Sequence, residues 1–187
     1  MITLNSDAAS TSLSKTTKAI LNEYGIKLNK NLGQNYLIDR NKRDQIIQFG
    51  NLTKDDVVLE IGPGIGTLTI ELAKKVKKVI AIEQDSNICQ ILENRLKKEN
   101  IDNVELINDD ALNVEFPKFD KIISNLPYQI SSPITFKFLN YDFQLAILMY
   151  QKEFASRMNG KVGSKDYSRL SAMLYFKCDV DLLTGVS

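Results

Sequence analysis

Four short polar stretches in this chain carry residue types that could bind or activate a small molecule. They are Glu60 to Gly66, Glu83, Asp109-Asp110 and Asn125 to Tyr128, and each ends or follows an apolar run. Carboxylates accept hydroxyl and amine hydrogens, and glycines let the backbone approach a ligand closely. The chain contains no histidine, which excludes histidine bases, histidine-activated nucleophiles and histidine-ligated zinc. Any chemistry here must proceed without an imidazole.

The first two stretches together favour an adenosine cofactor. In Glu60-Ile61-Gly62-Pro63-Gly64-Ile65-Gly66, glycines at alternate positions keep Cβ atoms away from a bound molecule. Glu83 ends a later apolar run, where a carboxylate can accept both hydroxyls of an adenosine ribose. A dinucleotide is less well supported, because the glycine spacing differs from the dinucleotide pattern and Pro63 lacks an N–H for a pyrophosphate. A glycine-rich turn with a purely structural role remains an alternative.

Asp110 follows a third apolar run, and a carboxylate at that point can accept the exocyclic amine of an adenine. Either Asp109 or Asp110 could instead be a helix N-cap or a turn residue. The place of Asp110 in a series with Gly62 and Glu83 favours the binding role.

The stretch Asn125-Leu126-Pro127-Tyr128 suggests activation of an aromatic amine. Such a nitrogen is a poor nucleophile because its lone pair is delocalised into the ring. The Asn125 side-chain oxygen and the Leu126 carbonyl can accept its two N–H groups and favour a tetrahedral nitrogen. Pro127 fixes φ near −65°, and Tyr128 offers a ring on which a flipped-out base can stack, worth ~1–3 kcal/mol.

Alternating strands and helices must position these residues. The predicted strands are 57–62, 79–83, 104–108, 121–124, 145–150 and 176–183. The predicted helices are 14–24, 41–49, 67–75, 86–98 with Ser86 as N-cap, 133–139 and 167–175. This alternation predicts an α/β fold with a mostly parallel sheet covered by helices on both faces. Ligands are then expected at the C-terminal ends of the strands.

Composition is consistent with one soluble domain. The chain has 187 residues, of which 43% are hydrophobic and 25% charged, and the net charge is +1. Residues 1–12 are rich in Ser, Thr and Ala and are expected to form a flexible tail, and no segment is apolar enough for a membrane span or secretion signal. We therefore expect a cytoplasmic protein. Cys89 and Cys178 lack metal-ligand spacing and are expected to be buried thiols, with no metal site.

Charge is distributed unevenly along the chain. Residues 1–50 carry seven basic and four acidic residues, and residues 150–187 carry six and four, whereas the middle is acidic. A polyanion held by the two ends would fit this distribution, although offsets of this size also arise by chance.

Taken together, the motifs resemble the ribosomal RNA adenine N6,N6-dimethyltransferase family, and the small-subunit branch in particular. The resemblance rests on residues 33–37, 60–66, Glu83, 110–111, 125–128, 151–157 and 164–171, in the order in which the family has them. It implies a class I methyltransferase fold, with S-adenosylmethionine as methyl donor and small-subunit ribosomal RNA in a pre-ribosomal particle as partner. A monomer is the default expectation.

The resemblance also assigns roles to individual residues. The catalytic residues are expected to be Asn125, Leu126, Pro127 and Tyr128. The expected cofactor-binding residues are Gln34, Asn35, Leu37, Gly62, Gly64, Glu83, Asp110 and Asn125. The expected RNA-binding residues are Lys152, Arg157, Lys161, Lys165 and Arg169, for which a solvated surface is the alternative.

The family pattern continues beyond the end of this chain into a further strand and a small helical domain. We therefore expect residues 1–25 to be a tail with a short helix, 26–187 to be the catalytic domain, and the helical domain to be absent. Two other functions remain open. One is a large-subunit resistance methylase or DNA adenine methyltransferase, and the other is a non-catalytic assembly or transcription factor.

Overall fold

The computed structural model describes Leu13, Lys15, Thr17, Ala19, Ile20, Glu23, Leu37 and residues 39–185. Its elements are α2 (Arg40–Phe49), β1 (Val57–Ile61), α3 (Thr69–Ala73), β2 (Lys78–Glu83), α4 (Ser86–Lys98), β3 (Val104–Asn108), β4 (Lys121–Asn125), η2 (Tyr128–Ile130), α5 (Ser131–Phe138), β5 (Leu145–Met149), α6 (Lys152–Met158) and α7 (Arg169–Tyr175). The five strands form one sheet in the order β3-β2-β1-β4-β5, and every neighbouring pair is parallel. This confirms the predicted α/β fold.

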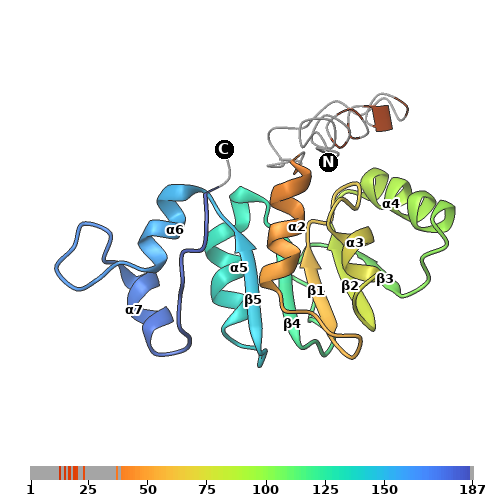
Figure 1. Ribbon diagram of the computed structural model, residues 1–187. Helices are drawn as coiled ribbons and strands as arrows, with labels where there is room; N and C mark the ends of the chain where they lie inside the picture. The colour runs from red at the N-terminus through yellow and green to blue at the C-terminus, as the bar shows by residue number, and fades with distance from the viewer. Residues whose placement is uncertain are drawn as a thin grey trace.

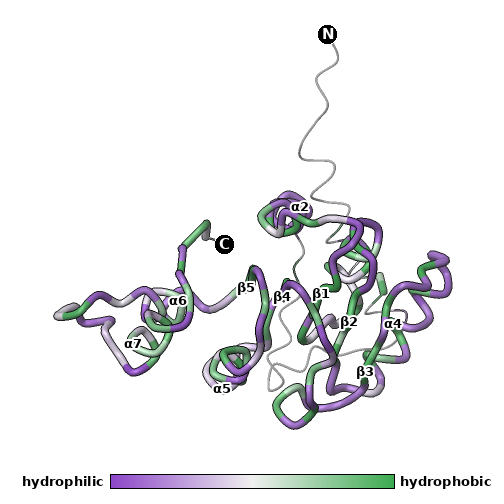
Figure 2. Tube along the Cα trace, turned by 90° about the horizontal axis from the view of Figure 1, so that it is seen from below, coloured by the Kyte–Doolittle hydropathy of each residue, from purple (hydrophilic) through white to green (hydrophobic). Residues whose placement is uncertain are grey.

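Helices cover both faces of this sheet, as an all-parallel sheet requires. Figure 2 places α2 and α5 on opposite sides of the strands. On one face, apolar residues of α2 and α3 pack on β1 and β2, with Ile47 and Leu72 among the buried side chains. On the other face, Phe138 of α5 packs with Phe116 and Phe119 of the segment after β3. Two apolar layers therefore fix the positions of the strand ends.

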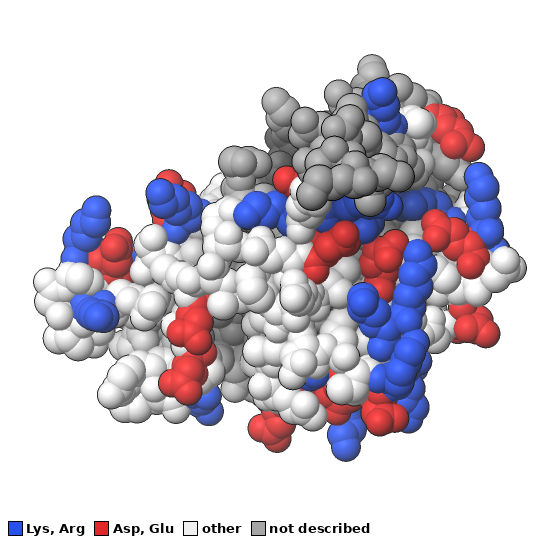
Figure 3. Space-filling model, viewed as in Figure 1, with Lys and Arg blue, Asp and Glu red and all other residues white. Residues whose placement is uncertain are grey.

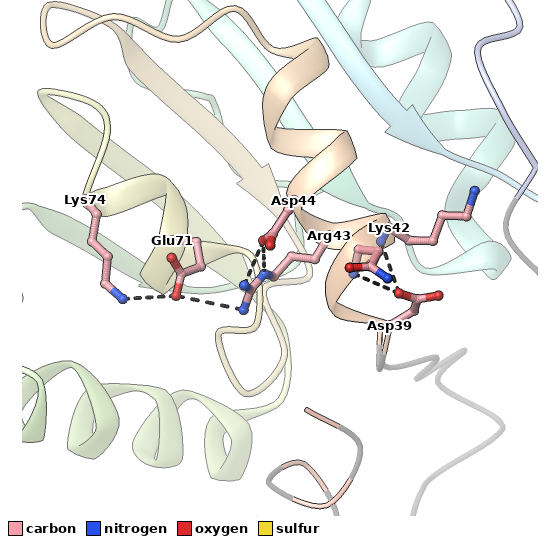
Figure 4. Close-up of polar contacts among 7 residues, drawn as sticks. Asp39, Lys42, Arg43, Asp44, Glu71 and Lys74 are labelled. Carbon is pink, nitrogen blue, oxygen red and sulfur yellow. Dashed lines mark hydrogen bonds and ion pairs between the residues drawn. The ribbon is translucent and has the colours of Figure 1, made fainter. Parts of the chain in front are cut away.

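Polar contacts also fix α2 against α3. Asp39 caps α2 by accepting hydrogen bonds from the Asn41 and Lys42 amides at 2.8 and 3.2 Å. Arg43 is buried, with its guanidinium 2.7 Å from Asp44 and 3.8 Å from Glu71 of α3 (Figure 4). The contact with Glu71 links α2 to α3, the helix that follows the glycine-rich residues 62–66.

The strands β1 and β4 pair over a shorter length than the other neighbours. The register pairs Val58 with Lys121 and Leu59 with Ile122, whereas β1 and β2 are paired along all of β1. Further along, the Ser124 hydroxyl donates to the Ile61 carbonyl at 2.6 Å and links the two strands beyond their paired residues. The register pairs of β1 and β4 therefore end before the C-terminal edge of the sheet, where the strand order reverses.

The predicted strand at 176–183 is wrong. Residues 178–185 have no regular structure, and none of the described residues pairs with them as a strand. Alternating hydrophobicity suggested a strand, but a strand exists only with a hydrogen-bonded partner. The same stretch contains Cys178, which is exposed, whereas Cys89 is buried as predicted.

Other differences concern helix boundaries. Helix α6 is not predicted from the sequence, in which residues 152–158 stand out only as part of a basic run. The N-cap of α4 is Asp85 and not Ser86, because the Asp85 carboxylate accepts from the Asn87 and Ile88 amides. Helix α5 begins at Ser131, so Pro133 lies in its first turn, where a missing N–H costs no helical hydrogen bond. The described positions between residues 13 and 23 are helical, and the expected tail at 1–12 lies outside the described residues.

The part formed by α6 and α7 lies beyond β5, at the edge of the sheet (Figure 1). Figure 3 shows basic side chains on this part, with acidic side chains among them. No helix among the described residues is long and apolar enough to cross a membrane.

Candidate active site

A pocket lies at the C-terminal edge of the sheet, where β1 to β4 end. Its lining combines one apolar wall with carboxylates and an amide, and includes Leu37, Glu60, Gly62, Gly64, Glu83, Asp110, Asn125 and Pro127. The motifs that the sequence places after separate strands therefore meet at one site, as the parallel topology predicts.

The glycine loop needs its glycines for geometric reasons. Gly62 and Gly64 have φ values of +67° and +54°, a region that residues with a side chain rarely adopt. A Cβ on Gly62 would lie 2.9 Å from Cγ of Pro127, which is closer than van der Waals contact allows. The loop after β1 therefore touches the loop after β4, and together they close one end of the pocket.

Glu83 is held by the same loop. Its Oε2 accepts a hydrogen bond from the Gly64 amide at 3.1 Å, and its Oε1 accepts from the Asp85 amide at 3.0 Å. Burial raises the pKa of the Glu83 carboxyl, and the nearby Asp85 charge adds to this, against the two amide hydrogen bonds. Each carboxylate oxygen has a second lone-pair site, so Glu83 can still accept hydroxyl hydrogens from a ligand.

Asp110 begins the turn that follows β3. Its Oδ1 accepts from the Leu112 amide at 2.9 Å, and its Oδ2 accepts from the Asn113 side-chain amide at 3.0 Å. The turn-forming role that the sequence left open for this aspartate is therefore real. It does not exclude ligand binding, because Asp110 also lines the pocket.

The four residues predicted to be catalytic separate into two pairs. Asn125 ends β4 and lines the pocket with Pro127, whose φ of −61° matches the expected value. The Leu126 side chain lies in the core, with 1% exposure, and Tyr128 is half-buried at the start of η2. Of the four side chains, those of Asn125 and Pro127 are the ones that line the pocket.

Glu60 begins the glycine motif, and the sequence alone predicts no role for it. It is 2% exposed, lines the pocket, and its Oε2 has no hydrogen-bond partner among the described residues. Burial raises the pKa of this carboxyl to about 8, against the opposite influence of the Thr69 hydroxyl, and the Glu83 charge contributes in the same direction as burial. The sequence could have indicated a role for Glu60, because a single acidic residue in an otherwise apolar buried strand is unusual.

The remaining predicted site residues lie in three places. Leu37 is buried and lines the pocket, as expected for a cofactor contact. Gln34 and Asn35 lie outside the described residues. The five basic residues expected to bind RNA are exposed on or near α6 and α7 and do not line the pocket. These residues are Lys152, Arg157, Lys161, Lys165 and Arg169.

One of these basic residues has an internal contact. The Arg169 guanidinium lies over the Phe136 ring of α5, 5.7 Å from its centroid. A cation held over a ring is less available to an RNA phosphate than the lysines of the same surface. No group of three or more Cys, Asp or Glu among the described residues is arranged to hold a metal ion.

Comparisons with known proteins show which family this chain resembles over most of its length. Residues 25–187 match the profile of the family described as "Ribosomal RNA adenine dimethylase". Among curated relatives, a "Probable ribosomal RNA small subunit methyltransferase A" of Methanosphaera stadtmanae is 56% identical over 167 residues, which are 89% of this chain and 62% of that protein. A protein of the same name from Methanothermobacter thermautotrophicus is 54% identical, over 89% of this chain and 60% of that protein.

Solved structures give the same result for the fold. A dimethyladenosine transferase from Plasmodium falciparum aligns with a TM-score of 0.68 and 43% identity, over 71% of this chain and 49% of that one. The 23S rRNA methyltransferase ErmE aligns with a TM-score of 0.66 and 34% identity, over 75% of this chain and 57% of that one. The chain spans about three fifths of the length of these curated relatives. It belongs to the ribosomal RNA adenine dimethylase family.

Proposed function

We propose that this chain is the catalytic domain, residues 26–187, of a small-subunit ribosomal RNA adenine N6,N6-dimethyltransferase. It transfers methyl groups from S-adenosylmethionine to N6 of two adjacent adenines. The observation that carries the proposal is the convergence of Glu60, Gly62, Glu83, Asp110 and Asn125 on one pocket at the C-terminal ends of β1 to β4.

The pocket fits the proposed cofactor by the chemistry of its donors and acceptors. Glu83 offers acceptors for the ribose hydroxyls, and Asp110 offers one for the adenine amine. The buried Oε2 of Glu60 has no partner among the described residues and would accept from a cationic amino group, whose charge would favour the ionised form of this carboxyl against the effect of burial. Gly62 leaves a surface without Cβ atoms. When bound, S-adenosylmethionine supplies an electrophilic methyl group on a positively charged sulfur.

The residues of the β4 loop would activate the target amine. The Asn125 side-chain oxygen and the Leu126 carbonyl would accept the two N–H groups of N6 and so favour a tetrahedral, more nucleophilic nitrogen. This nitrogen would take the methyl group that the bound cofactor supplies, and the electron pair of the broken bond would stay on the cofactor's sulfur. The alkylated nitrogen then loses a proton to water or to a neighbouring acceptor, and no histidine base is needed. Tyr128 would stack on the flipped-out adenine.

The substrate is proposed to be small-subunit ribosomal RNA within a pre-ribosomal particle. The exposed lysines at 152, 161 and 165 would contact its phosphates, together with Arg157. Small-subunit specificity is supported by the names of the relatives at 54–56% identity, whereas the large-subunit enzyme ErmE is 34% identical. We also propose that the protein acts as a cytoplasmic monomer.

The test uses methyl-labelled S-adenosylmethionine with three substrates in parallel. These are unmethylated small ribosomal subunits, unmethylated large subunits, and protein-free small-subunit RNA. After digestion, label in N6,N6-dimethyladenosine from small subunits or their RNA supports the proposal. Label from large subunits alone would favour a resistance-type methylase. Cofactor binding without label in any RNA would favour a non-catalytic binding module.

A further inference from the structure

The turn after β3 is held from the neighbouring helix by Lys137 of α5. The Lys137 ammonium donates to the carbonyl oxygens of Ala111, Leu112 and Val114 at 2.9, 3.1 and 2.5 Å. An ammonium group has three N–H donors, so these three bonds use all of them. The Phe116 ring lies 4.4 Å from the same nitrogen and adds a cation–π contact.

Asp110 belongs to the same turn. The Asp110 carbonyl accepts from the Asn113 and Val114 amides at 2.9 and 3.1 Å, and its carboxylate accepts from the Leu112 amide. The position of the Asp110 carboxylate therefore follows the position of the turn. Since Lys137 binds three carbonyls of that turn, it restrains the carboxylate without touching a ligand.

Lys137 is not an ordinary solvated lysine. Burial lowers the pKa of its ammonium, against the opposite influence of the Asp110 and Glu115 charges. Placing a cation in this environment is unfavourable unless its donors are all used. Helix α5 follows η2, which comes directly after the loop with Asn125 and Leu126, so Lys137 links the turn carrying Asp110 to the helix that follows the amine acceptors in the chain.

We propose that Lys137 is a positioning residue that fixes the Asp110 carboxylate toward the adenine amine of the cofactor, and so sets the preference of the pocket for adenine over hypoxanthine. The inference rests on the proposed cofactor. An adenine presents an N–H donor at this position, whereas hypoxanthine presents a carbonyl oxygen. A fixed carboxylate attracts the first and repels the second. A carboxylate free to move away would discriminate less.

The experiment measures two dissociation constants by calorimetry, one for S-adenosylhomocysteine and one for its inosine analogue. The test variant is Lys137→Met, which removes the donors. Lys118→Met is the matched control, because Lys118 is an exposed lysine on the β3–β4 connection, the segment whose turn Lys137 binds. In Lys137→Met the preference for the adenosine ligand is expected to fall about tenfold, as for loss of a hydrogen bond to a charged group. The control should keep the wild-type preference, and Lys137→Arg should recover part of it.

The ratio of the two constants separates positioning from a general structural role. A role in stability alone would weaken both ligands equally or lower the melting temperature, and would leave the ratio unchanged. An unchanged ratio in a folded Lys137→Met protein therefore overturns the inference. Lys137→Gln, which keeps one donor group, gives the same comparison if the methionine variant does not fold. If the wild-type chain binds neither ligand, the proposed function fails as well.

Discussion

The C-terminal edge of β1 to β4 and the part of the chain beyond β5 hold their polar side chains in different ways. At the strand ends, Glu83 and Asp110 are tied to backbone amides by hydrogen bonds of 2.9 to 3.1 Å. On α6 and α7 the basic side chains are exposed, and large apolar side chains are also exposed there, including Tyr175 and Phe176 at 83% and 82%. The polar side chains of the first region are held by hydrogen bonds within the chain, whereas those of the second are exposed with apolar side chains among them, as we expect for the proposed RNA-binding surface.

This difference suggests that the two regions have separate functions. The pocket would determine cofactor identity and the chemical step, and the α6–α7 part would determine how strongly RNA is held. Substitutions in one region should then leave the property assigned to the other unchanged. The predictions for the pocket and for the basic residues test that independence, from the largest expected effect on activity to the smallest. The prediction for Asp56 tests the stability of the sheet that carries the pocket.

The largest effect is expected for Asn125→Ala. Loss of the amide acceptor should lower the transfer rate by about a hundredfold to a thousandfold, as for removal of one preorganised polar group in other active sites. Cofactor affinity should change little. The checks are single-turnover methyl transfer and calorimetry, with the exposed Asn140→Ala as the control. Transfer at the wild-type rate would rule out the proposed role of Asn125.

Glu83→Ala should weaken cofactor binding by about a hundredfold, because it removes two hydroxyl acceptors and the anchor of the Gly64 amide. Glu93→Ala on the exposed side of α4 is the matched control. Calorimetry with S-adenosylhomocysteine measures the change. A dissociation constant equal to that of the wild type would show that the ribose does not bind at this strand end.

Asp56→Asn should destabilise the fold, because Asp56 and Lys121 form a buried ion pair at 2.9 Å at the N-terminal ends of β1 and β4. Breaking such a pair costs about 3–5 kcal/mol of unfolding free energy. Burial would raise the pKa of Asp56, but hydrogen bonds from Thr53 and Lys121 outweigh it and the pKa is lowered. The stabilisation is therefore complete at neutral pH, above the ordinary carboxyl pKa of 3.8, and is lost as the pH falls through the lower folded-state value.

Urea unfolding of wild type and Asp56→Asn at several pH values checks this. The difference between the two proteins should be constant near pH 7 and should shrink below pH 4. A difference that persists unchanged into acid would mean that the ion pair is not its source.

The smallest effects are expected for single alanine substitutions of Lys152, Arg157, Lys161 and Lys165. Each should weaken RNA binding a few-fold and reduce the salt dependence of binding by about one counterion. Arg169→Ala should do less, because its guanidinium lies over Phe136. Fluorescence anisotropy with labelled RNA at several salt concentrations measures both quantities. A change in cofactor affinity in these variants would contradict the independence of the two regions.

The same two regions explain which sequence predictions succeeded. The strands β1 to β5 were predicted to within a residue or so of their ends, because each is an apolar run between turn residues. Once these strands were known to be parallel, the convergence of Gly62, Glu83, Asp110 and Asn125 followed from topology alone.

Predictions failed where contacts distant in sequence decide the outcome. The stretch 176–183 alternates like a strand but has no pairing partner in the described part of the chain. Two strong N-cap residues, Asp85 and Ser86, stand side by side, and only the structure shows which one accepts the helix amides. The roles of Glu60 and Lys137 also depend on neighbours from other elements, Glu83 in the first case and the turn at 111–114 in the second.

The most direct test of the account is a crystal structure of this chain with S-adenosylhomocysteine. The account predicts the ribose hydroxyls within hydrogen-bond distance of Glu83, the adenine amine at Asp110, and the sulfur facing Asn125. A ligand bound elsewhere, or bound in this pocket with its adenine away from Asp110, would contradict it.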